Sequence, residues 1–451
     1  MTEQMSDRDY RLAFIQAINQ KQGSAERERQ YYVPITNPAI RGTDLCERLL
    51  NIVDLTVGDA VTVVTGPRGS GKTSELLRLG DRLQDRAFVL VDIADILRPN
   101  EPVNIGLFLT AITVGLIERV APTSRSRTAR TAGASFWTRL KEALERLTIE
   151  GADLTVGTDG LPVQVATKIR VSLTDSPSFQ TQVAKAMKNN RAAFRAEMFD
   201  MIKDLSKKLA GNQGLTPVLV IDSLEHWRGT ADDAAPNSHV KVRESIERLF
   251  DDYQDELSLP GFHVVYCAPS YCHCSWARTA DMLNIKVAGE HGGRFEPGLE
   301  QLRVILRQRA PGVGDLDRLF SEPEQLDLVL QTSGGLFRDL FRLVMAVILN
   351  SPTLPATSES IALALAEERR VAMAGPNGMP REQLQLLAAV AKDSQFHPTR
   401  AQQFDFDVLE TLGAILRYPD GAMNYWLGVH PLFSEVIKGL DVGNSETTNA
   451  L

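Results

Sequence analysis

The sequence predicts an α/β fold built on a parallel five-stranded sheet, and three observations support this prediction. A glycine-rich loop over residues 66–73 lies between the alternating apolar run Val61–Thr65 and the helical pattern Ser74–Leu79. An uninterrupted apolar run, Val218–Ile221, ends at an aspartate, as expected of a parallel strand that is covered on both faces. Strand and helix patterns also alternate along the first 120 residues, which is typical of βαβ units.

The loop of residues 66–73 has the composition and the setting of a phosphate-binding loop. Its glycines allow backbone N–H groups to point at phosphates, Lys72 supplies a positive charge, and Thr73 offers a hydroxyl to Mg²⁺ at a helix N-terminus. We therefore predict an ATP or GTP site in a P-loop NTPase core. The residues expected to contact the nucleotide are Gly66, Pro67, Arg68, Gly69, Ser70, Gly71, Lys72, Thr73 and Ser74.

The strand Val218–Asp222 is the candidate for a Walker B strand, which we expect to lie beside the phosphate-binding loop. Asp222 would stand at the carboxyl end of the strand, where open α/β sheets bind ligands, and would hold Mg²⁺ directly or through water. Glu225 follows three residues later and is the candidate to orient or deprotonate the attacking water. The alternative is that Glu225 only caps the next helix.

Length and composition indicate a globular protein of several domains. The 451 residues suggest two to four domains of about 150 residues each. Hydrophobic residues make up 43% and charged residues 24%, and a net charge of −8 gives no overall attraction to nucleic acid or acidic membranes. The sequence shows neither a membrane-spanning run nor the pattern of a signal peptide, so we expect a cytoplasmic protein and no membrane partner.

Three of the four cysteines, Cys267, Cys272 and Cys274, lie within eight residues that also include His273. Four cysteines in this length do not form a disulfide framework. A zinc site is one interpretation, but the adjacent Cys272 and His273 do not match the spaced ligand pairs of structural zinc sites. Reduced, partly buried cysteines are the favoured interpretation.

Further elements follow in chain order. We expect an amphipathic helix in the first thirty residues, a helix that contains Leu45 and Val53, a strand over Phe88–Asp92, and a helix from Ile105 to Val120. An insertion over residues 124–211 precedes the Walker B strand and is predicted to hold a hairpin around Val163–Leu173 and a long helix from Ser178 to Leu209.

The insertion also carries basic residues, for which two interpretations stay open. They form a solvated face, or they form a surface for a phosphate backbone or a partner. The residues are Arg125, Arg127, Arg130, Lys168, Arg170, Lys185, Lys188, Arg191 and Arg195.

The second half of the chain completes the sheet and adds helices. A helix over Val240–Tyr253 and strands over Phe262–Cys267 and Asn284–Val287 give the core its five parallel strands. Residues 298–350 are helical in pattern, and the strand-turn-strand pattern of residues 414–427 after helices favours a winged helix. The predicted divisions are an N-terminal helical segment 1–34, an ATPase core 35–297, a helical lid 298–375, a winged-helix-like domain 376–441 and a disordered tail 442–451.

With these motifs placed, residues 35–440 resemble an AAA+ or STAND-type ATPase of the origin-recognition-like branch. Residues 40–45 are similar to the adenine-contacting entry motif, with Arg41 and Gly42 in reversed order, and residues 222–225 match the STAND form of Walker B, with His226 in place of a second acid. Ser270 stands where the family has a polar sensor of the γ-phosphate. Residues 333–339 resemble sensor 2 of the lid, whose arginine would be Arg338.

The resemblance implies ATP and Mg²⁺ as cofactors and a homo-oligomer as the active assembly. Such assemblies use an arginine finger that acts on the neighbouring subunit, and Arg278 is the first candidate for it, with Arg294 as the second. No Asn-Lys-x-Asp stretch that would specify guanine occurs, in agreement with ATP.

These observations lead to three alternative functions for the chain. The first is an ATPase switch that controls a separate effector protein, with bacterial anti-phage defence as the setting that the resemblance implies. The second is a DNA-binding AAA+ loader or transposition-type regulator; the predicted wing, residues 418–421, carries an acid and no basic stripe, which favours packing and autoinhibition instead. The third is a nucleotide-binding regulator that does not hydrolyse.

Overall fold

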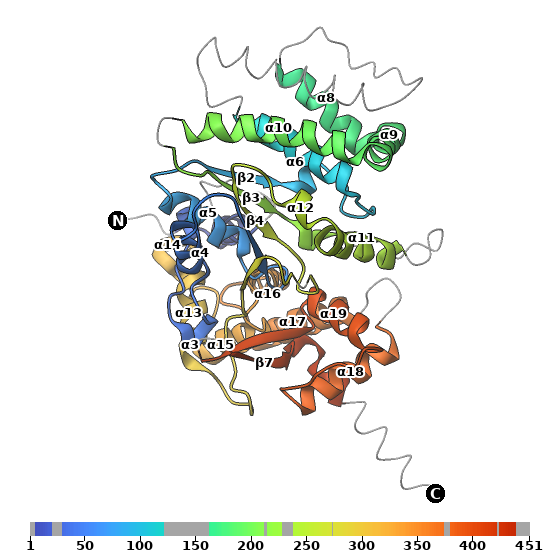
Figure 1. Cartoon of the computed structure of the whole chain (residues 1–451). Helices are drawn as coiled ribbons and strands as arrows, with labels where there is room; N and C mark the ends of the chain where they lie inside the picture. The colour runs from blue at the N-terminus through green and yellow to red at the C-terminus, as the bar shows by residue number, and fades with distance from the viewer. Residues whose placement is uncertain are drawn as a thin grey trace, which may run out of the picture. The chain divides into compact units, whose positions relative to one another are not determined.

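The structure is a computed structural model of the 451-residue chain, and two compact units make up its fold (Figure 1). It describes residues 5–19, 29–120, 162–211, 214–227, 238–272, 274–373, 379–421 and 424–438. The sheet unit comprises Glu47–Thr65 and Leu79–Ala280. The P-loop unit comprises Met1–Cys46, Gly66–Arg78 and Asp281–Leu451.

A five-stranded sheet with the order β2-β3-β4-β1-β5 forms the centre of the sheet unit. Its strands are β1 (Ala60–Thr65), β2 (Phe88–Asp92), β3 (Val218–Asp222), β4 (His263–Cys267) and β5 (Arg278–Asp281). The pairs β1–β4, β3–β4 and β2–β3 are parallel. The predicted α/β class is confirmed, and the first four predicted strands agree with the structure within one residue. Strand β4 lies between β1 and β3, so one strand separates the predicted Walker B strand from the strand that precedes the P-loop.

The fifth strand corrects the prediction for Asn284–Val287. Strand β5 is Arg278–Asp281, and three of its four residues are exposed, so it has no apolar pattern that a sequence search would find. Residues 284–287 belong to the P-loop unit instead. There the backbone N–H of Asn284 donates to the Arg417 carbonyl (2.9 Å), and that of Lys286 donates to the Ile40 carbonyl (2.8 Å).

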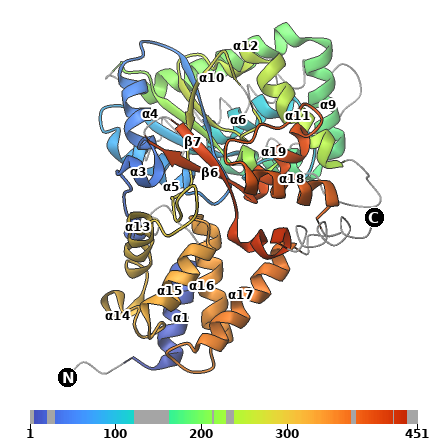
Figure 2. The ribbon, with the colours of Figure 1, turned by 90° about the horizontal axis from the view of Figure 1, so that it is seen from below.

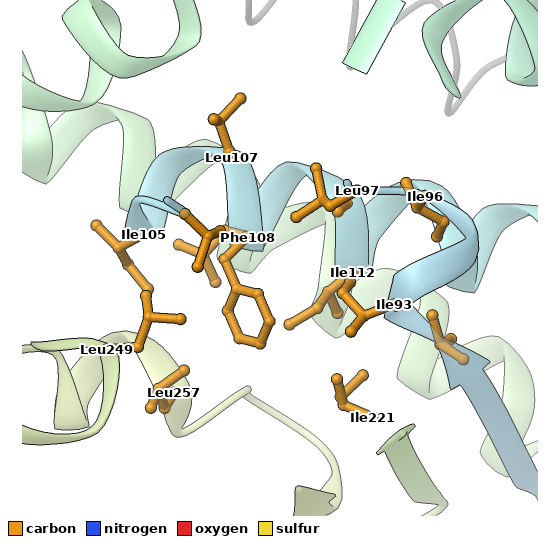
Figure 3. Packing of buried hydrophobic residues seen from close by; sticks show 14 of the residues in the cluster. Ile93, Ile96, Leu97, Ile105, Leu107, Phe108, Ile112, Ile221, Leu249 and Leu257 are labelled. Atoms are coloured by element: carbon orange, nitrogen blue, oxygen red, sulfur yellow. The ribbon is translucent and has the colours of Figure 1, made fainter. Parts of the chain in front are cut away.

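Helix α6 (Ile105–Val120) forms the centre of the apolar core in the sheet unit. Every residue from Ile105 to Ile117 is buried, because α6 packs against β2 and against the three helices that the structure describes in the insertion. Figure 3 shows Phe108 of α6 near Ile112 and Ile221. Leu249 of α11 (Ser238–Asp252) lies on the side of α6 toward which the Phe108 ring points. Burying large apolar side chains in this way is the main source of folding free energy.

The described part of the insertion is helical throughout, which corrects the predicted hairpin and the single long helix. It forms α8 (Pro162–Asp175), α9 (Pro177–Asn189) and α10 (Arg191–Ala210). Alternating β-branched residues suggested strands, but Ile169 and Leu173 are buried while Val171 is 49% exposed, which is helical spacing. Asn190 separates α9 from α10 with a non-helical backbone (φ −135°, ψ 47°).

Three arginines of the insertion have partners within the sheet unit. Arg170 donates to the Asp95 carbonyl (2.9 Å), Arg191 donates two bonds to Glu256 (2.7 and 2.9 Å), and Arg195 lies 3.6 Å from Asp255. The two interpretations of the basic residues both stay open. Arg125, Arg127, Arg130 and the Lys168 side chain lie outside the described part.

A second apolar core lies in the P-loop unit, and Figure 2 labels helices of this unit. They are α1 (Asp7–Ile18), α3 (Pro38–Arg41), α13 (Glu296–Arg307), α14 (Pro311–Gly314), α15 (Pro323–Thr332), α16 (Phe337–Asn350) and α17 (Ser358–Met373). Helix α1 packs against α16 with Tyr10, Phe14 and Ile18 buried, so the predicted amphipathic helix is confirmed over residues 7–18.

In the C-terminal part of this unit, two helices that the structure describes precede an antiparallel hairpin. The elements are α18 (Arg381–Lys392), α19 (Gln403–Leu412), β6 (Ile415–Asp420), β7 (Asn424–Val429) and the 3-10 turn η4 (Pro431–Phe433). The rings of Tyr418 and Trp426 pack across the hairpin with centroids 4.7 Å apart. The predicted strand-turn-strand is therefore confirmed, and the winged helix stays a prediction. The predicted tail 442–451 lies outside the described residues.

Candidate functional site

The P-loop adopts a backbone that only glycine tolerates at three positions. It joins the end of β1 at Thr65 to α5 (Lys72–Arg82). Gly66, Gly69 and Gly71 have φ values of 146°, 82° and 93°, in the region that side chains disfavour. A Cβ atom at Gly69 would lie 2.4 Å from the Cβ of Arg338. The loop geometry therefore requires the glycines for conformation and, at Gly69, for space as well.

Polar groups of the P-loop fit a bound triphosphate. The ammonium of Lys72 donates to the carbonyls of Gly66 (2.9 Å) and Pro67 (3.0 Å), so it is folded back over the loop. In the described structure, the buried Oγ of Ser70 has no hydrogen-bond partner, although such atoms are normally satisfied. Thr73 is the second residue of α5, at a helix N-terminus that favours anions. These residues could hold Mg²⁺ and the phosphates of a nucleotide.

The Walker B segment has a strained turn directly after its aspartate. Ser223 has φ 74° and ψ 14°. Among the described residues it is the only one other than glycine with a positive φ. Its N–H donates to Asp222 Oδ1 (2.8 Å), and the turn leads into the 3-10 helix η3 (Leu224–His226). Glu225 lies buried in η3, not at a helix cap. Strain of this kind often accompanies functional sites.

A second aspartate lies beside Asp222 at the carboxyl edge of the sheet. Asp92 ends β2 and is the register partner of Asp222 on β3. Burial raises the pKa of Asp92, a hydrogen bond with Ser223 opposes that rise, and the charges of Asp95 and Glu225 add to it. Asp92 was not among the predicted site residues. The signal was present, since Phe88–Asp92 is an apolar strand that ends in aspartate, as Val218–Asp222 is.

Ser270 lies in the turn after β4. Because β4 runs between β1 and β3, and all three are parallel, this turn leaves the sheet between the end of β1 and Asp222. The role of Ser270 as a sensor of the γ-phosphate stays a prediction. This is the fold of a P-loop NTPase.

Arg338 is the second residue of α16 and lies against the P-loop within the P-loop unit. Its backbone N–H donates to the Gly69 carbonyl (3.3 Å). Its guanidinium donates to Asp339 at 3.1 and 3.2 Å and to the Leu412 carbonyl at 3.4 Å. The structure thus brings together two predicted site segments that are more than 250 residues apart in the sequence.

Arg41, the predicted adenine contact, is buried and its guanidinium binds protein groups. It donates to the Ser70 carbonyl of the P-loop, and its Nη1 lies 3.5 Å from Glu75 Oε1. Glu75, on the first turn of α5, also accepts from the hydroxyl of Tyr32 (2.9 Å). Sequence reasoning missed Glu75, because an acid on a helix that also carries arginines is an ordinary pattern.

The two candidates for an arginine finger have partners in their own units. Arg278 begins β5 and donates to the hydroxyl of Thr56. Arg294 forms ion pairs with Asp327 and, at 3.4 Å, with Glu296. Their proposed action on a neighbouring subunit stays a prediction.

The cysteine cluster has no metal-binding geometry in the described residues. Cys267, Cys272 and Cys274 are buried and form no disulfide among the described residues, and His273 lies outside them. The described histidines, cysteines and acids form no group of three or more that could hold a metal ion. Burial raises the pKa of Cys274 to about 12, and the charge of Asp251 adds to that rise, so its thiol stays protonated at neutral pH.

Comparisons with known proteins found similarity among solved structures. No protein-family model matches the chain. No curated protein matches it either. A Walker-type ATPase of Pyrococcus abyssi is similar over 91% of this chain and 99% of its own, with 11% identity and a TM-score of 0.42. The RuvB Holliday junction branch migration motor of Thermotoga maritima is similar over 88% and 95%, with 11% identity and a TM-score of 0.32.

A third similar structure is the HORMA:CdnC:Trip13 complex of E. coli MS115-1. The similarity covers 80% of this chain and 86% of the matched one, with 12% identity and a TM-score of 0.30.

Among the helices that the structure describes, none is long and apolar enough to cross a membrane.

Proposed function

We propose that the chain is an ATPase switch that binds ATP with Mg²⁺ at the P-loop and hydrolyses it. Lys72 and the loop amides bind the phosphates, Thr73 and Asp222 hold the metal, and Glu225 orients the attacking water. The bound Mg²⁺ would neutralise charge on the phosphates. Hydrolysis in such sites depends on positioning and on charge stabilisation, and these residue types supply both.

The contact between Arg338 and Gly69 is the observation that carries this proposal. The first turn of α16 starts at the P-loop, so a phosphate bound there comes within reach of the Arg338 side chain. Arginine suits this role because its guanidinium makes charge-assisted hydrogen bonds to phosphate oxygens. A ligand that binds one arrangement of loop and lid more tightly shifts the population toward that arrangement. Nucleotide state would in this way control the lid.

The output of the switch is assembly with further copies and control of a separate effector protein. Arg278 would act as an arginine finger toward a neighbouring copy, and Ser270 would sense the γ-phosphate. These roles, and a setting in anti-phage defence, rest on the resemblance of the motifs to AAA+ and STAND-type ATPases.

The test is ATP turnover by the purified chain with and without duplex DNA at two salt concentrations, together with the assembly mass in each nucleotide state. Lys72→Ala and Glu225→Gln are the control variants. Turnover that ignores DNA, together with nucleotide-dependent assembly, supports the switch. Turnover that DNA stimulates and salt suppresses would favour a DNA loader, because phosphate contacts release counterions. Binding without turnover would identify a regulator that does not hydrolyse.

A further inference from the structure

Arg41 holds the backbone of the P-loop from within the same unit. Its guanidinium donates to the Ser70 carbonyl, and its Nε lies 3.5 Å from the Leu283 carbonyl. The guanidinium carbon lies 5.4 Å from the centre of the Phe337 ring, and the residue is only 8% exposed. Protein groups on several sides therefore fix this side chain in one place.

An acidic residue of α5, the helix directly after the P-loop, also contacts the guanidinium of Arg41. Glu75 lies 3.5 Å from Arg41 and 3.3 Å from Arg78, and Arg78 also pairs with Asp44 at 2.9 Å. The hydroxyl of Tyr32 donates to Glu75 as well. Two arginines and two carboxylates thus form a balanced, largely buried network, which avoids the cost of an unpaired buried charge. The network joins the entry segment of residues 32–44 to the loop.

Holding a carbonyl also fixes the neighbouring amide. In a planar trans peptide the C=O of one residue and the N–H of the next point in opposite directions. The contact from Arg41 to the Ser70 carbonyl therefore sets the direction of the Gly71 N–H, on the other side of the peptide. If this peptide turned over, a carbonyl oxygen would take the place of an N–H, and carbonyl oxygens repel phosphate.

We propose that Arg41 is a positioning residue for phosphate binding, which holds the Ser70–Gly71 peptide so that the Gly71 N–H is available to a polyphosphate ligand. The inference rests on the proposed nucleotide site and adds to it a residue that acts through the loop. It replaces the adenine contact predicted for Arg41. A positioning role makes no distinction between bases, whereas an adenine contact does.

The experiment measures the affinity of Mg²⁺-ATP, Mg²⁺-GTP and inorganic tripolyphosphate for the full chain by calorimetry. Arg41→Gln is expected to weaken all three ligands by a similar factor of about 10- to 100-fold, the size of a charged hydrogen bond. The ratio of ATP to GTP affinity should stay unchanged. Arg41→Lys keeps the charge and one donor, so a smaller loss is expected for all three ligands.

Matched variants separate positioning from general destabilisation. Arg303 of α13 is a largely buried lid arginine that pairs with Asp327, so Arg303→Gln removes a comparable ion pair away from the loop. It should lower the melting temperature and leave the three affinities unchanged. Glu75→Gln keeps Arg41 but weakens its hold, and should reduce all three affinities by a smaller factor. These two variants keep the test valid if Arg41→Gln does not fold.

Two results would overturn the inference. If the Arg41 variants lose ATP affinity but retain tripolyphosphate affinity, Arg41 contacts the base and not the loop. If they bind all three ligands as the wild type does, the contact has no role in binding. Failure of the wild type to bind any of the ligands would instead reject the nucleotide site itself, and the inference with it.

Discussion

Arg338 and Asp339 are neighbours in the chain, and their side chains form an ion pair at the start of α16. Two hydrogen bonds of 3.1 and 3.2 Å join the guanidinium to the carboxylate. Asp339 Oδ2, which accepts from Arg338 Nη2, also lies 3.2 Å from Nε2 of His430. Since His430 follows β7, one buried carboxylate connects the residue beside the P-loop to the C-terminal hairpin.

The first prediction concerns the competition between Asp339 and phosphate for Arg338. Asp339→Asn removes the ion pair, so the guanidinium is released for a nucleotide. We expect ATP affinity to rise by about 2- to 5-fold, the size of a partly exposed ion pair. The free energy of unfolding should fall by about 1–3 kcal/mol, because a buried hydrogen-bonding network is disrupted. Calorimetry and urea unfolding measure the two quantities.

The control for this prediction is Arg338→Gln, which removes the group for which Asp339 and phosphate compete. This variant should lose ATP affinity, and the double variant with Asp339→Asn should bind ATP no more tightly than Arg338→Gln alone. An Asp339→Asn variant that binds ATP more weakly than the wild type would contradict the proposed competition.

The second prediction concerns the strained turn at Ser223. Ser223→Gly relieves the cost of a positive φ, while glycine loses more entropy on folding, so its stability should stay within about 1 kcal/mol of the wild type. Ser223→Val places a β-branched residue in the same conformation and should destabilise the protein by at least about 1–2 kcal/mol. Urea unfolding of both variants tests this. Equal stability of the two variants would contradict the strained conformation.

The third prediction concerns the pH dependence of stability at His263, which begins β4. Burial, together with the charges of Arg278 and Arg86, lowers the pKa of His263 to about 4, from about 6.5 in an unfolded chain. Between these values the unfolded state binds one more proton than the folded state. Stability should therefore fall as the pH is lowered from 6.5 to 4, by up to about 1.4 kcal/mol per pH unit from this group.

His263→Gln removes this titration and keeps a polar group near Thr62, whose Oγ1 lies 3.1 Å from His263 Nε2. Urea unfolding between pH 4 and pH 7 should show a flatter pH dependence for this variant than for the wild type. Parallel curves would show that His263 is protonated equally in the two states.

The fourth prediction separates the roles of Glu225 and Lys72. Glu225→Gln should lower ATP turnover by about 100- to 10,000-fold while ATP still binds, since the lost group acts on the attacking water. Lys72→Ala should instead weaken binding itself, because the ammonium belongs to the phosphate-binding loop. Single-turnover kinetics and equilibrium binding distinguish the two results. A Glu225→Gln variant with normal turnover would restrict Glu225 to a structural role.

Local pattern was sufficient for the elements that are continuous in the chain. The P-loop, helix 105–120 and strands such as Val218–Asp222 were predicted because glycine placement and apolar periodicity act over a few residues. The same reasoning failed at Val163–Leu173, where alternating β-branched residues suggested strands. Packing of Ile169 and Leu173 in the apolar core of the sheet unit decided in favour of a helix.

Contacts between segments that are distant in the chain could not be predicted from the sequence, and only the tertiary structure defines them. The sequence determined the phosphate-binding loop and the acidic end of β3, because each motif is a run of adjacent residues. Only the fold decided that β5 is Arg278–Asp281, that Asp92 is paired with Asp222, and that Arg41 binds the loop backbone. Such pairings depend on which buried charges and backbone groups find partners across the chain, and a linear pattern does not encode that choice.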